Sequence, residues 1–210
     1  MTALIVTAHP DMNSLTHQVT ACLGGLLEGQ QPQFAHLDQE QFDPRFTVED
    51  WRLYRGAGRP HPSVLREQER LDGVTDVVLV FPLYWWSMPA ILKGWIDRVF
   101  ISGWAFDDDG DGPVQPLLQH LTMHLLPLAG TEEESITRHG YATSFATQIE
   151  QGIIGFCGMR HGTTAFIHES ESTDRAAVEA AVVAATARIA AGVPGNTGAG
   201  AGRAGRRVAS

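Results

Sequence analysis

The sequence predicts an α/β protein with a doubly wound, five-stranded parallel sheet and helices on both faces. Three observations point to this fold. Short, nearly continuous apolar runs recur along the chain, as expected of strands buried on both faces. Stretches with helical spacing of apolar residues alternate with these runs, and short polar turns join the two kinds of segment. The length of 210 residues suits one such domain.

The expected strands follow the apolar runs in order. The first run reads Ala-Leu-Ile-Val-Thr-Ala, and the clearest reads Asp-Val-Val-Leu-Val-Phe. Both have the composition of central strands of a parallel sheet. The strands are expected at 3–8, 34–37, 76–81, 121–126 and 163–168.

The expected helices fill the intervals between the strands. The first begins near Leu15, where Asn13 or Ser14 can supply the N-cap, and Pro89 opens another at its first position. The last is rich in alanine. The helices are expected from Leu15 to the glycines at 24–29, and at 48–54, 63–71, 89–100, 144–155 and 173–191.

The charge and composition of the chain argue against several classes of function. The net charge of −9 argues against a nucleic-acid partner, and the chain has no 18-residue apolar run that could span a membrane. Cys22 and Cys157 are far apart, so we expect reduced thiols and a cytoplasmic protein. The sequence predicts one domain over 1–192. The Gly/Ala/Arg-rich stretch at 193–210 cannot bury a core, and we expect a disordered tail there.

The turn after the first strand, residues 9–16, has the layout of an anion cradle. It follows a buried strand and ends at a helix N-terminus, where free N–H groups and the helix dipole attract a phosphate. Ser14 and Thr16 add hydroxyl groups, and His9 adds an imidazole. An ordinary helix cap is the alternative interpretation of the same residues.

The turn after the third strand concentrates flat aromatic surface in Tyr84, Trp85 and Trp86. Such a turn cannot be fully buried without leaving backbone polar groups unpaired. Aromatic walls beside backbone donors suit a planar heteroaromatic ring. The same side chains could instead form a homodimer contact, and the two interpretations are compatible.

One long segment makes a resemblance specific. The stretch Phe-Pro-Leu-Tyr-Trp-Trp-Ser-Met-Pro-Ala-Ile-Leu-Lys-Gly-Trp-Ile-Asp-Arg-Val-Phe, residues 81–100, resembles the signature of the flavodoxin-like NAD(P)H:quinone oxidoreductases. This group includes the DT-diaphorase type and bacterial flavoproteins of potassium-efflux systems. The opening at 3–10, with Ser14 and Leu15, is similar to the same family. The resemblance implies a flavodoxin-like fold, a homodimer, FAD or FMN at the carboxyl edge of the sheet, and NAD(P)H as co-substrate.

The resemblance also assigns roles to residues. It implies that the first turn holds the flavin phosphate, that the aromatic turn borders the flavin ring, that Gln68 lies near the adenine half of FAD, and that the turn after the fourth strand completes the site. The residues so implied are His9, Ser14, Leu15, Thr16, Gln68, Pro82, Leu83, Tyr84, Trp85, Trp86, Ala129, Gly130 and Thr131.

The turn after the fourth strand departs from the family pattern. Family members carry Thr-Thr-Gly-Gly followed by a tyrosine, whereas this chain has Leu-Ala-Gly-Thr at 128–131 and Ile136 where the tyrosine is expected. His139 or Tyr141 could take over the catalytic role. The three glutamates at 132–134 are expected to form a solvated acidic turn, which would disfavour an anionic reduced ring if it lay close by.

The sequence thus predicts a flavin-dependent NAD(P)H oxidoreductase that reduces a quinone or similar small molecule in a ping-pong cycle. A flavin-binding regulatory subunit, for example of an ion-efflux system, is the alternative, and a flavin-free structural homologue is a third. No metal is expected. The acidic run at 107–112 lacks the last ligand of a calcium loop, and His120 and His124 lack the glutamate of a zinc-protease motif.

Overall fold

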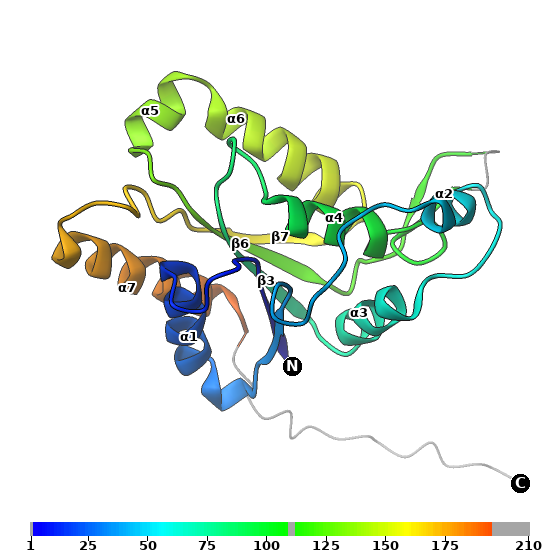
Figure 1. Ribbon diagram of the computed structural model, residues 1–210, viewed down its shortest axis with the longest axis horizontal. Coiled ribbons are helices and arrows are strands. Elements are labelled where there is room, and N and C mark those ends of the chain that lie inside the picture. Colours follow the sequence, from blue (N-terminus) through cyan, green and yellow to red (C-terminus); the bar gives the residue numbers. More distant parts are fainter. Residues whose placement is uncertain (1, 109–111, 195–210) are drawn as a thin grey trace, which may run out of the picture.

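A five-stranded parallel sheet forms the centre of the computed structural model, which describes residues 2–108 and 112–194 (Figure 1). The strand order is β2-β1-β3-β6-β7. The order reverses between β1 and β3, which is where doubly wound sheets bind ligands. The strands are β1 (Ala3–Thr7), β2 (Gln33–His36), β3 (Asp76–Pro82), β6 (Thr122–Leu128) and β7 (Arg160–Thr164).

The three central strands are the ones with the most continuous apolar sequence. Every residue of β1 is buried, as are all but one residue of β3 and of β6. In register, Val6 of β1 lies beside Leu79 of β3, which in turn lies beside Leu125 of β6. The prediction of parallel strands buried on both faces is confirmed.

The fifth strand differs from the prediction in its position. It begins at Arg160, three residues earlier than expected, and its pairing with β6 shifts register around His124. There the backbone N–H of Thr163 donates to Nδ1 of His124. A Cβ at Gly162 would lie 2.5 Å from the same imidazole, so the bulge accommodates this ring. Because β7 is a partly exposed edge strand, it lacks the apolar run that marks a central one.

Helices cover both faces of the sheet. On one face α1 packs against α7, and Figure 1 shows them side by side. Residues of α3, α4 and the segment α6–η2 share a second apolar core on the opposite face, which includes Leu71, Trp95 and Ile154. The helices are α1 (Leu15–Leu26), η1 (Glu28–Gln30), α2 (Val48–Tyr54), α3 (Pro62–Asp72), α4 (Ala90–Val99), α5 (Glu133–Arg138), α6 (Tyr141–Phe145), η2 (Ala146–Gly155) and α7 (Arg175–Gly192).

The helix expected at 144–155 begins earlier and changes character. It starts at Tyr141 as α6 and continues as η2, a run of wider turns. The N–H of Phe156 accordingly bonds to the carbonyl of Gln151, five residues back. Helices with i→i−5 hydrogen bonds are rare, so the sequence predicts an ordinary α-helix here.

The acidic segment at 132–134 is also corrected. The prediction of a turn is wrong in conformation, because Glu132 caps α5 and Glu133 begins it. Carboxylates in the first turn of a helix are favoured by the helix dipole, which explains why the segment is helical. All three glutamates are exposed, as the sequence predicted.

The remaining elements of the fold lie next to the residues that the structure does not describe. A two-stranded antiparallel pair, β4 (Phe106–Asp107) and β5 (Gln115–Pro116), flanks residues 109–111, which lie outside the described residues. Val193 is buried against the core on the α1 and α7 face, although the sequence assigned it to the tail. Residues 195–210 of the expected tail lie outside the described residues. Within the described ranges, no helix is long and apolar enough to cross a membrane.

Candidate functional site

The start of α1 offers backbone N–H groups at the carboxyl edge of the sheet. Oγ of Ser14 accepts a hydrogen bond from the N–H of His17 at 3.4 Å and so caps the helix. Among the described residues, the N–H groups of Leu15 and Thr16 have no acceptor. Two free N–H groups at the positive end of a helix can hold an anion, which is the arrangement that the sequence predicted.

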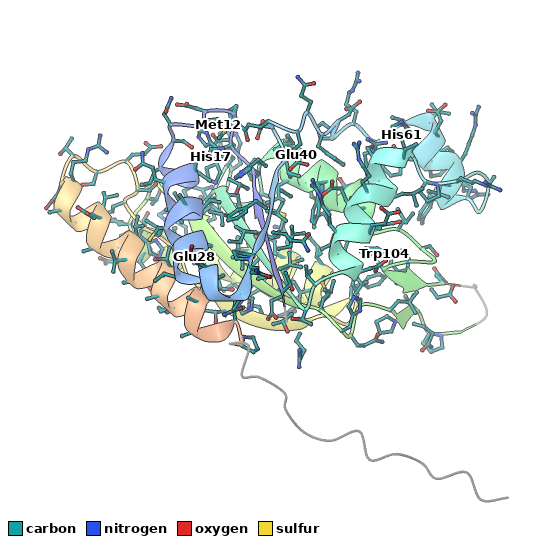
Figure 2. The ribbon with its side chains drawn as sticks, turned by 90° about the horizontal axis from the view of Figure 1, so that it is seen from below. Met12, His17, Glu28, Glu40, His61 and Trp104 are labelled. Atoms are coloured by element: carbon teal, nitrogen blue, oxygen red, sulfur yellow. The ribbon has the colours of Figure 1, made fainter. Side chains whose placement is uncertain are left out.

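His9 shapes this loop from within. Its Nδ1 accepts from the N–H of Asp11 at 3.1 Å, and its carbonyl oxygen lies 3.1 Å from Nε2 of the buried His17. Figure 2 shows Met12, His17 and Glu40 along one edge of the molecule, whereas Glu28 lies at the other end of α1. The loops after β1 and β2 therefore face the same side.

The aromatic turn after β3 is tight and strained. Tyr84 and Ser87 exchange two backbone hydrogen bonds, of 3.1 and 3.0 Å, around a two-residue turn. The two central residues, Trp85 and Trp86, have φ of 49° and 63°. Positive φ at both central positions defines a type I′ turn, which favours Asn-Gly and costs larger side chains energy. Strain of this kind is concentrated at functional sites.

The two tryptophans lie in different surroundings. The side chain of Trp85 is 93% exposed. Trp86 instead stacks on Tyr141, with ring centroids 3.9 Å apart and planes 6° from parallel. His139 stacks on Tyr141 in turn, at 5.6 Å and 16°. The structure thus brings the aromatic turn together with both residues that the sequence proposed as substitutes for the family tyrosine.

The loop after β6 joins the same edge. The N–H of Leu83 donates to the carbonyl of Leu128 at 2.7 Å, which ties the aromatic turn to this loop. Ala129 is buried, and Gly130 and Thr131 follow it toward α5. Ile136, at the position where the family tyrosine is expected, is buried. Its aliphatic side chain has no hydroxyl group and so does not replace that residue chemically.

Gln68 lies apart from these three loops. It is buried on α3, and its Nε2 donates to the carbonyl of Val99 at the end of α4, at 2.9 Å. This bond gives Gln68 a structural role in joining two helices. Its contact with a cofactor stays a prediction.

The segment after β7 is not among the site residues that the sequence predicts. The N–H groups of Glu169 and Ser170 donate to the carbonyls of Thr131 and Ala129, so this segment is hydrogen-bonded to the loop after β6. A Cβ at Gly130 would lie 3.2 Å from the carboxyl carbon of Glu171. Its only sequence signal is its place after the last strand, because the carboxyl ends of parallel strands share one edge.

A separate apolar cavity of about 350 Å³ lies between α2, α4 and η2. Burial raises the pKa of the Cys157 thiol at its wall to about 11, so this cysteine is a packed, unreactive thiol. Both Cys157 and Cys22 are free. The cavity is lined by Phe46, Asp50, Leu53, Tyr54, Ile96, Asp97, Phe100, Ile101, Ser102, Phe106, Gly152, Ile153, Phe156 and Cys157. It does not include the aromatic turn, so it is distinct from the site at the sheet edge.

Comparison with known proteins agrees with the fold. A family described as having a flavodoxin-like fold matches residues 1–191. The chain belongs to this family. Its flavodoxin-like topology also matches NAD(P)H:quinone oxidoreductase from Methanothermobacter marburgensis, with a TM-score of 0.80 and 22% identity, over 89% of this chain and 96% of the other.

Curated relatives of this flavodoxin-like chain include two rat enzymes. NAD(P)H dehydrogenase (quinone) 1 of Rattus norvegicus is 32% identical over 125 residues, which cover 59% of this chain and 44% of the relative. Ribosyldihydronicotinamide dehydrogenase (quinone) of the same species is 36% identical over 118 residues, or 55% and 51% of the two chains. The chain therefore spans about half the length of these relatives.

Proposed function

We propose that this protein is a flavin-dependent NAD(P)H oxidoreductase that reduces quinones or similar small acceptors. The overall reaction converts NAD(P)H, a proton and a quinone into NAD(P)⁺ and a hydroquinone. The observation that carries the proposal is the convergence, at one edge of the sheet, of the free N–H groups of α1 and the stacked rings of Trp86 and Tyr141. The names of the two rat relatives support turnover rather than a regulatory role.

The residues at this edge fit a flavin. The N–H groups of Leu15 and Thr16 would hold its phosphate, and Ser14 and His9 would keep their loop in place. The stack of Trp86 on Tyr141 supports the assignment of this place to a planar ring. When bound, a flavin accepts a hydride from a reduced nicotinamide and passes two electrons to an acceptor.

The chain itself contributes binding and alignment. Aromatic walls can hold two ring systems parallel and close, which removes much of the entropic barrier to hydride transfer. If the nicotinamide and the acceptor use the same slot in turn, the kinetics will be ping-pong. Tyr141 and His139 are the polar groups on the stack, and we assign to them the handling of charge on the reduced ring. The protein would act in the cytoplasm, where reduced nicotinamides are supplied.

The decisive experiment is an absorbance spectrum of the purified protein followed by steady-state kinetics. We expect the yellow spectrum of an oxidised flavin and identification of FAD or FMN by chromatography after release. We expect parallel double-reciprocal plots with NADH and a simple benzoquinone. A colourless protein that takes up neither flavin, or rates no faster than those of free flavin, would contradict the proposal.

We also propose that a second copy of this chain covers the apolar cavity, giving a homodimer. Aromatic side chains at its rim are unusually exposed: Phe46 by 49%, Tyr54 by 64% and Phe156 by 47%. Exposed apolar patches of this kind mark interaction surfaces. Light scattering should report twice the chain mass, and Tyr54→Glu with Phe156→Glu should halve it; a monomeric native protein would refute the dimer.

A further inference from the structure

Two buried polar atoms at the carboxyl end of β2 have no hydrogen-bond partner among the described residues. They are Nδ1 of His36, the last residue of the strand, and Oδ2 of Asp38, which lies in the turn that follows. A buried polar atom without a partner costs free energy, so each such atom calls for an explanation by a water, an ion or a ligand. Because an ionised carboxylate only accepts hydrogen bonds, the partner of Asp38 must be a donor.

The turn that carries Asp38 is fixed by its own hydrogen bonds. The N–H of Gln41 donates to the carbonyl of Asp38 at 3.1 Å. One carboxylate oxygen of Glu40 accepts from the N–H of His36 at 3.0 Å, and the other accepts from Arg70 at 2.7 Å. Glu40 is therefore occupied, whereas the buried oxygen of Asp38 is held ready on a fixed backbone. A group that is ordered in advance loses little entropy when it binds a ligand.

The end of β2 lies beside the start of α1. His36 pairs in register with the last residue of β1, and its ring centroid lies 5.2 Å from that of His17 in the first turn of α1. Nε2 of Gln39 donates to the carbonyl of His9 at 3.4 Å. Figure 2 shows His17 and Glu40 along the same edge of the molecule. The turn after β2 thus borders the loop that leads to the free N–H groups of α1.

The strand order β2-β1-β3-β6-β7 gives a bound ligand a direction. The aromatic turn follows β3 and the segment that leads to Tyr141 follows β6, whereas the proposed phosphate site follows β1. A flavin held by these loops would therefore extend from β3 toward β1, and the next loop in that direction is the one after β2. FMN ends at its phosphate, whereas FAD continues into a second phosphate, a ribose and an adenine. The hydroxyl groups of a ribose are donors of the kind that Asp38 requires.

We infer that the end of β2 is a ribose subsite, in which Asp38 accepts from a hydroxyl group of the ribose of a nucleoside diphosphate and Nδ1 of His36 bonds to the neighbouring hydroxyl. The inference rests on the proposed function and assigns FAD, rather than FMN, as its flavin. In other doubly wound proteins, an acidic side chain after the first turn of the sheet binds the ribose of a dinucleotide in this way. The aromatic turn and the free N–H groups of α1 serve both flavins, so the ribose subsite is what distinguishes them.

The test measures dissociation constants by titration calorimetry on the full chain after removal of bound flavin. The ligands are FAD, FMN, ADP and 2′,3′-dideoxy-ADP, which lacks both ribose hydroxyl groups. Asp38→Ala removes the acceptor, and His36→Phe keeps a ring against Phe34 while removing both nitrogens. Glu28→Gln, an exposed residue at the far end of α1, is the matched control.

The native chain should bind FAD about tenfold or more tightly than FMN, and ADP about tenfold more tightly than its dideoxy analogue, because hydrogen bonds to charged groups are the stronger ones. Asp38→Ala should weaken FAD and ADP by about the same factor and abolish the difference between ADP and its analogue. FMN should bind this variant within about twofold of the native value, which also shows that the variant is folded. His36→Phe should cause a smaller loss for FAD and ADP, and Glu28→Gln should behave as the native chain.

Equal affinity of the native chain for ADP and its dideoxy analogue would overturn the ribose subsite, and this comparison needs no variant. The subsite would also be refuted by FMN binding as tightly as FAD, or by a crystal structure of the FAD complex with only a water between His36 and Asp38. These results would leave the proposed function intact, because FMN supports the same chemistry. Failure of the native chain to bind either flavin would instead refute the proposed function, and the ADP comparison would still decide on the subsite.

Discussion

Trp86 and Tyr141, 55 positions apart in the chain, lie face to face with ring centroids 3.9 Å apart. One belongs to the strained turn after β3, and the other begins α6. The pair is the point at which the loops after β3 and β6 meet through side chains. Under the proposed function, this pair forms a wall against which a planar ligand is aligned.

Removing the Tyr141 ring should damage both stability and turnover. Stacked aromatic pairs contribute about 0.5–1.5 kcal/mol beyond the area they bury, so Tyr141→Ala should lower the free energy of unfolding by at least that amount. Tyr141→Phe keeps the stack and removes the hydroxyl group; it should unfold like the native chain and lose about tenfold or more in kcat, as expected when a proton donor is removed. Urea unfolding and quinone-reduction kinetics measure the two effects. Native kinetics in both variants would remove Tyr141 from the catalytic assignment.

The turn at Trp85 should trade stability against function. A residue other than glycine held at positive φ costs about 1–3 kcal/mol, and asparagine tolerates this conformation better than most residues. Because the Trp85 ring is almost fully exposed, Trp85→Asn loses little packing and should raise the free energy of unfolding by about 1 kcal/mol. The same change should weaken flavin retention.

Trp85→Ala is the matched control for this turn. Alanine removes the ring without favouring positive φ, so it should weaken flavin retention with no gain in stability. Chemical unfolding and dialysis against flavin-free buffer separate the two quantities. If both variants retained flavin as the native chain does, the ring of Trp85 would have no part in the site.

The central sheet could be predicted because buried strands carry a continuous local signal. Residues 76–81 were expected as a strand, and β3 covers Asp76–Pro82. The edge strand β7 was misplaced because an exposed strand needs no apolar run. The contact of Trp86 with Tyr141 could not be predicted, since it depends on how two loops from different strands fold over the same edge. Likewise, nothing local in the sequence shows that Glu171 reaches Gly130.

Gly94 is required where α4 meets the chain after β2. A Cβ at this position would overlap the carbonyl oxygen of Pro44, so Gly94→Ala should destabilise the fold by about 1–3 kcal/mol or more, as overpacking does. Gly25, near the end of α1, has open space around it. Gly25→Ala should stabilise the protein by up to about 1 kcal/mol through helix propensity. Thermal unfolding of both variants provides the comparison, and similar behaviour of the two would refute the close approach at Pro44.

A buried ion pair attaches the segment between β2 and α3 to helix α4. Nε and Nη2 of Arg98 donate to the carboxylate of Asp50 at 2.9 and 3.3 Å, and both side chains are less than 10% exposed. Nη1 donates to the carbonyl of Asp43 at 2.7 Å. Burial opposes ionisation of Asp50, yet hydrogen bonds from the backbone and hydroxyl of Thr47 and from Arg98 outweigh it and hold its pKa below the ordinary value.

The last prediction is a loss of stability in acid that depends on Asp50. Because folding lowers the pKa of Asp50, the pair stabilises the fold above about pH 4, the unfolded value, and this contribution is lost as the pH falls through the lower folded value. Asp50→Asn leaves Arg98 buried without a counter-charge and should cost about 3–5 kcal/mol at pH 7. The difference from the native chain should shrink below pH 4. Asp97→Asn, which breaks an exposed pair with Lys93 on the same helix, should cost less than about 0.5 kcal/mol at either pH. Urea unfolding at pH 7 and pH 3 checks both variants, and an equal, pH-independent cost for the two would show that the buried pair does not control acid stability.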